Sequence, residues 1–92
     1  MKLPSPDQAQ DTAIAVFGRI VADEERLGRF FDLTGLRPDS IRTASTSSQF
    51  FEAVLDHVVG YEPLLIAIAG ELEMDPQAIV AAHARLAPPP LE

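Results

Sequence analysis

Apolar residues recur along this chain with the spacing of amphipathic α-helices. One such stripe follows Ser5 and Pro6, a capping residue and a proline suited to the first position of a helix. Two further stripes lie in residues 24–33 and 50–59, and the second of these is the strongest in the chain. Apolar residues three or four positions apart predict helices that each bury one face. We therefore predict an all-α fold, a compact bundle of five to six short helices.

Turn and capping residues indicate where the other helices begin and end. Gly35 is suited to the left-handed turn that ends a helix, and Thr46, followed by Gln49, predicts a capped start for the next strong helix. Asp75 and Pro76 predict the start of the last helix. Residues 64–72, LLIAIAGEL, are apolar almost all round, which is typical of the buried central helix of a bundle.

The chain uses the same turn pattern twice. Residues 35–41 read GLRPDSI and residues 73–79 read EMDPQAI, so Pro38 and Pro76 lie 38 positions apart and each is followed three positions later by an isoleucine, Ile41 or Ile79. Apolar positions elsewhere match at the same offset. We therefore predict two similar three-helix units, about 11–44 and 49–86, in a single domain that spans 1–92 with frayed tails at 1–4 and 87–92.

Charge and composition narrow the class of protein. The 92 residues include no cysteine and carry a formal net charge of −7, and Arg85 is the only base after residue 46. Disulfides are therefore excluded, and an acidic surface disfavours nucleic acid as a partner. No apolar run approaches the ~20 residues that span a bilayer, and the N-terminal residues lack the apolar segment of a secretory signal. We predict a cytoplasmic protein that does not contact a membrane.

Candidate catalytic and metal-binding residues are few. No metal-ligand spacing connects His57 and His83, so we interpret them as one partly exposed histidine and one at the boundary of the core. The acidic clusters at 23–25 and 71–75 stand at predicted helix starts or turns, where capping explains them. We therefore predict a protein that is not an enzyme and has no catalytic residue, cofactor or metal.

Two phenylalanine pairs are the strongest candidate for a functional surface. Phe30–Phe31 and Phe50–Phe51 are adjacent on their helices, and adjacent helical residues point about 100° apart. A thin bundle would bury one ring of each pair and leave the other at its edge, where the rings would form an apolar patch for a partner. The alternative is a core large enough for all four. We predict a protein–protein interaction module, with an unknown protein or a second copy of the chain as the partner.

A second function stays open. Short helices joined by tight turns could imitate a helix-turn-helix and bind nucleic acid weakly, provided that Arg26, Arg29, Arg37 and Arg42 gather on one face.

The sequence also resembles a small alphaproteobacterial family of unknown function, the domain of unknown function family 3572, from about Ala13 to Leu86. The matching features are the run Glu25-Arg26-Leu27, Gly35-Leu36 followed by Pro38, and an acidic turn ahead of Leu64-Leu65. The resemblance implies an all-helical bacterial cytoplasmic protein. It implies no activity, substrate or catalytic residue.

Overall fold

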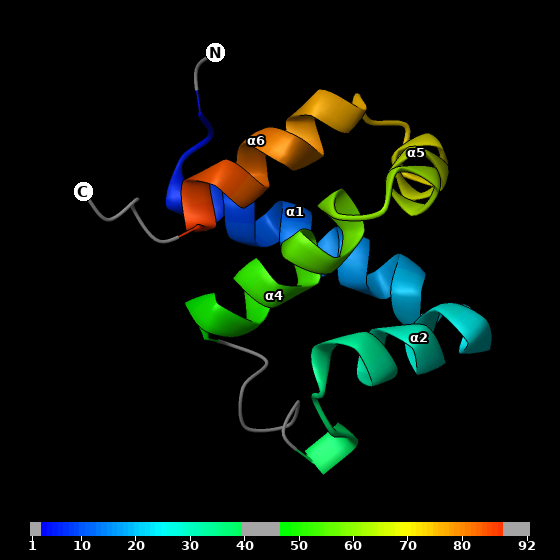
Figure 1. Cartoon of the computed structure of the whole chain (residues 1–92). Helices are drawn as coiled ribbons and strands as arrows, with labels where there is room; N and C mark the ends of the chain where they lie inside the picture. The colour runs from blue at the N-terminus through cyan, green and yellow to red at the C-terminus, as the bar shows by residue number, and fades with distance from the viewer. Residues whose placement is uncertain (1–2, 40–46, 88–92) are drawn as a thin grey trace.

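The computed structural model describes residues 3–39 and 47–87, and within these residues it contains five α-helices and no strand (Figure 1). The prediction of an all-α bundle is confirmed. The helices are α1 (Pro6–Val21), α2 (Glu24–Thr34), α4 (Ser48–Val59), α5 (Glu62–Glu71) and α6 (Pro76–Leu86).

Side-chain caps fix the starts of several helices. The Ser5 hydroxyl accepts from the Gln8 amide at 3.2 Å while the Gln8 side chain accepts from the Ser5 amide at 3.0 Å, the reciprocal capping box of α1. Asp75 caps α6 as predicted, accepting from the Gln77 amide at 2.9 Å. The predicted cap of α4, Thr46, is one residue too early. Ser47 makes it, with its hydroxyl 3.1 Å from the Phe50 amide, because adjacent hydroxyl residues are equally able to cap a helix.

Left-handed residues end α2 and follow α5. Gly35 has φ 74° and its amide donates to the Phe31 carbonyl at 3.0 Å, so the predicted end of α2 is confirmed. Glu73, which lies 38 positions later, has φ 55° and is the only non-glycine residue with positive φ in the described part of the chain. Pro38 begins a helical turn, as predicted, but Ile41 lies outside the described residues.

The core lies where α1, α4 and α6 pack against one another, with α2 and α5 against the outside of this group (Figure 1). The prediction that residues 64–72 form the central helix is therefore wrong. Only one side of α5 is buried, at Leu65, Ile68 and Ala69, and Ile66 on the other side is 54 % exposed. The reason is that α5 lies at one end of the bundle, where neighbouring helices cover a single face of it.

The helix boundaries agree with the 38-residue offset of the sequence. α1 ends at Val21 and α4 at Val59, while α2 begins at Glu24 and α5 at Glu62. Buried core positions match in the same way and join four pairs of residues: Ala13 with Phe51, Val16 with Val54, Ile20 with Val58, and Phe30 with Ile68.

Among the described residues, no single helix is long and apolar enough to cross a membrane; by length and composition alone, α4 and α5 pass only as a pair bent by 108°.

Candidate functional site

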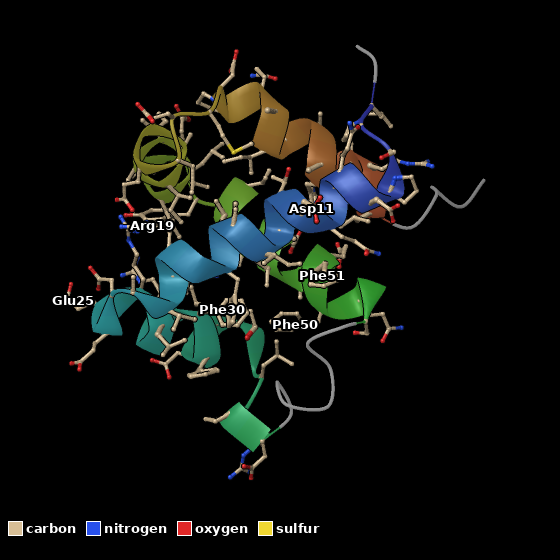
Figure 2. The ribbon with its side chains drawn as sticks, turned by 180° about the vertical axis from the view of Figure 1, so that it is seen from behind. Asp11, Arg19, Glu25, Phe30, Phe50 and Phe51 are labelled. Atoms are coloured by element: carbon tan, nitrogen blue, oxygen red, sulfur yellow. The ribbon has the colours of Figure 1, made fainter. Side chains whose placement is uncertain are left out.

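The predicted phenylalanine surface lies mostly in the core. Phe30, Phe50 and Phe51 are 0 %, 4 % and 6 % exposed, and only Phe31 is partly exposed. Figure 2 shows the three buried rings where α1, α2 and α4 meet. The expectation of an exposed aromatic edge is therefore corrected. The rings are buried because Phe17 of α1 packs against both pairs. The centre of its ring lies 5.6 Å from that of Phe30 and 5.1 Å from that of Phe50, so the two pairs join into one cluster.

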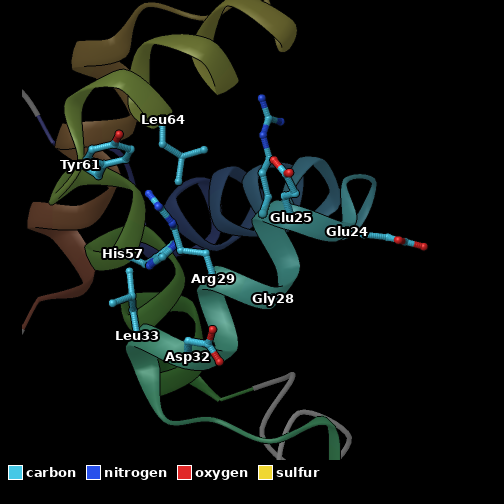
Figure 3. Close-up of a pocket in the computed structure, with 10 residues that line it drawn as sticks. Glu24, Glu25, Gly28, Arg29, Asp32, Leu33, His57, Tyr61 and Leu64 are labelled. Carbon is cyan, nitrogen blue, oxygen red and sulfur yellow. The ribbon is translucent and has the colours of Figure 1, made fainter.

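Two exposed apolar side chains, Leu33 and Tyr61, lie instead at a groove beside α2. Its lining comes from α2, from His57 near the end of α4, and from Tyr61 and Leu64 at the start of α5 (Figure 3). The hollow has a volume of about 950 Å³. Two large apolar residues at this groove face water, Leu33 at 70 % and Tyr61 at 48 % exposure. The groove is thus an open, partly apolar surface, and its two exposed apolar residues are not among the candidates of the sequence analysis.

An ion-pair cluster shares Arg26 with the lining of this groove. Arg26 of α2 reaches Glu71 at the end of α5 with two hydrogen bonds of 2.8 and 2.6 Å, and Arg19 of α1 bonds the same carboxylate at 2.9 Å. The hydrogen bonds from Arg26 and then Arg19 lower the pKa of Glu71 from 4.5 to about 2. The pKa of Arg26 is raised, chiefly by its hydrogen bonds to Glu71. These contacts link α1, α2 and α5 through one carboxylate.

The groove is also lined by Arg29 and by three carboxylates. Arg29 lies over the Tyr61 ring, with its guanidinium carbon 5.4 Å from the ring centre. Within the described residues, no ion pair holds Glu24, Glu25 or Asp32, which line the groove. The groove therefore combines an apolar floor with free carboxylates at its rim.

His57 is a half-buried polar residue of the groove. Its Nε2 atom is inaccessible to water and has no hydrogen-bond partner among the described residues, and its ring packs edge-on against Phe30 at 5.2 Å. Burial lowers the pKa of His57, and Arg29 lowers it further, although Asp56 partly opposes both. An imidazole packed edge-on against a phenyl ring, with its Nε2 atom shielded from water, gives His57 a packing role.

The second histidine lies in a polar cluster that sequence spacing did not reveal. His83 of α6 places its Nε2 atom 3.2 Å from an Asp56 oxygen and 3.7 Å from a Glu52 oxygen, both on α4. Glu52 and Asp56 are four residues apart and share a face of their helix, which is a usable signal. Their closeness to His83 was not predictable, because it depends on how α4 and α6 pack.

The arginines proposed for nucleic acid do not form a free basic face in the described residues. Arg26 is bonded to Glu71 and Arg29 stacks on Tyr61. Arg37 is exposed, and Arg42 lies outside the described residues.

Comparison with known proteins places the chain in a family. Residues 6–89 match the family described as protein of unknown function (DUF3572). The chain belongs to the DUF3572 family. The predicted resemblance to this family is confirmed, and the match of this DUF3572 chain extends from the start of α1 past the end of α6. No curated protein and no solved structure matches it significantly.

Proposed function

We propose that this DUF3572 protein is an interaction module whose groove beside α2 binds a basic, amphipathic helical segment of a partner protein. The observation that carries the proposal is the groove itself, where Leu33 and Tyr61 are left exposed beside three carboxylates that have no ion pair in the described residues. A helix with an apolar stripe would cover the exposed rings and side chains, because grooves of this kind accept amphipathic helices.

The charge of the partner follows from the rim. In the part of the chain that the structure describes, no ion pair holds Glu24, Glu25 or Asp32, whereas Arg26 is bonded to Glu71. A partner with lysine or arginine beside its apolar stripe would meet complementary charge, and the net charge of −7 would raise its rate of encounter. The net negative charge would slow the approach of an acidic partner, nucleic acid included. The rim carboxylates would then repel it at the groove.

Binding without catalysis is the activity that this geometry supports. Acid–base chemistry in the groove would need His57 beside a carboxylate that could orient it. Asp56 is the chain neighbour of His57, but its carboxylate bonds to His83 instead. The groove is also wide and open, whereas catalysis benefits from the exclusion of water.

The test uses two synthetic helices with the same leucine stripe, one flanked by lysines and one by glutamates. Fluorescence anisotropy should show that the basic peptide binds and the acidic one does not, with affinity falling as salt rises. Equal binding of the two peptides would refute the charge argument.

Two substitutions locate the binding site. Leu33→Gln and Tyr61→Ala should each weaken binding of the basic peptide, whereas Ile66→Ala should not, because Ile66 is equally exposed but does not line the groove. Sedimentation of the chain alone is the companion measurement. Self-association that Leu33→Gln abolishes would mean that a second copy occupies the groove, and it would overturn the proposal of a basic partner segment.

A further inference from the structure

We infer that Glu52, Asp56 and His83 form a binding site for one divalent transition-metal ion, for which zinc is the representative. The site is independent of the groove proposed above as the partner surface. Three potential ligand atoms, one imidazole nitrogen and two carboxylate oxygens, lie within 4.8 Å of one another. These are ligand types that zinc takes in proteins.

The spacing of the three atoms is close to that of a coordination shell. Ligands about 2.1 Å from a tetrahedral zinc ion are about 3.4 Å from each other. Nε2 of His83 lies 3.2 Å from Asp56 Oδ1 and 3.7 Å from Glu52 Oε1. Small rotations of the side chains would therefore suffice to bring all three atoms onto one ion.

The scaffold holds these ligands in place. Glu52 and Asp56 stand one turn apart on α4, and His83 comes from α6, which packs against α4 through buried residues of both helices, such as Leu55 and Ala82. Sites on packed helices are better preorganised than sites on loops. The Asp56 side chain is 69 % exposed, so water can complete the coordination sphere.

The imidazole determines which metals fit. Magnesium and calcium prefer oxygen ligands alone, whereas zinc and its transition-metal neighbours accept imidazole nitrogen. An ordinary ion pair between His83 and the two carboxylates is the competing explanation of the cluster. It predicts no selective binding of zinc.

Isothermal titration of the untagged chain with zinc chloride should show one ion per chain, and magnesium should give no comparable binding. His83→Gln should weaken zinc binding by about tenfold or more, since even loss of an outer-shell partner weakens metal sites by that factor. Asp56→Asn is the second variant, because a largely exposed side chain can be replaced without harm to folding.

The matched control is Asp7→Asn/Asp11→Asn, which neutralises two exposed carboxylates with the same spacing on α1. It should leave zinc affinity unchanged. In NMR spectra, zinc should shift the imidazole signals of His83 and not those of His57. No binding at millimolar zinc, equal affinity for magnesium, or unchanged zinc affinity of both His83→Gln and Asp56→Asn would overturn the inference.

Discussion

Replacing Phe30 by alanine tests the packing that removes the phenylalanine pairs from the surface. The Phe30 side chain is fully buried on α2 and contacts the rings of Phe17 and Phe50, which belong to α1 and α4. It also packs against Phe31 and against the imidazole of His57 at 5.2 Å. Phe30 is therefore the one buried residue of α2, and it packs this helix against the rest of the bundle.

The expected loss can be worked out from this environment. Phenylalanine-to-alanine changes in a core cost about 3–5 kcal/mol, and the favourable contacts with aromatic neighbours place Phe30 in the upper half of that range. We expect Phe30→Ala to lower the free energy of unfolding by about 4 kcal/mol. A chain of this length is stable by about 5–14 kcal/mol, so the variant would keep a folded population only if the protein is not at the low end.

Urea denaturation followed by circular dichroism measures this loss, with the slope of the transition compared between variants. Leu33→Ala is the matched control, since it lies three residues further along α2 and is 70 % exposed. It should change stability by less than about 0.5 kcal/mol. A loss below about 1 kcal/mol for Phe30→Ala, with an unchanged slope, would contradict the buried aromatic cluster and restore the paired rings as a candidate surface.

Two further predictions concern an ion pair and the two left-handed turns. Glu71→Gln should lower the free energy of unfolding by about 1 kcal/mol at neutral pH. The Glu71 side chain is about one third exposed, so solvent screening leaves only part of the stabilisation that its lowered pKa implies. Because the pKa of Glu71 in the folded state, about 2, lies below its ordinary value of 4.5, the stabilisation is complete above pH 4.5 and is lost as the pH falls toward 2. Urea titrations should show the difference in stability between wild type and Glu71→Gln closing over that pH range. An equal difference at every pH would contradict the pairing. Gly35→Ala should destabilise by about 1 kcal/mol and Glu73→Gly should stabilise by a similar amount, because both positions have positive φ and only glycine adopts it freely. Thermal melts of both variants check this, and shifts of the same sign would refute it.

Local signals in the sequence predicted the helices well. The caps at Ser5, Asp75 and Gly35 are contacts between residues at most four apart, so their geometry is already specified by the chain. The same is true of the apolar stripes, which decide which face of a helix is buried. The paired left-handed residues Gly35 and Glu73 also lie at the offset expected of a repeat, although the duplication stays a prediction.

Long-range packing limited what could be predicted. An apolar helix such as α5 reads as central because its composition permits burial on every side, but the number of neighbours that cover it depends on the whole bundle. The fate of Phe50 depended likewise on Phe17, which is 33 positions away in sequence and 5.1 Å away between ring centres. The contact of His83 with Asp56 likewise depends on long-range packing, because one residue comes from α6 and the other from α4.

The groove depends on two helices that do not pack against each other. α2 and α5 begin 38 positions apart in the sequence, and each contacts both α1 and α4. In the described part of the chain they make no direct packing contact, and Arg26 reaches across to Glu71 instead. α2 and α5 thus leave a gap between them, and the ion pair of Arg26 with Glu71 bridges it. Because the bridge is electrostatic, salt and acid should alter the groove before they alter the core.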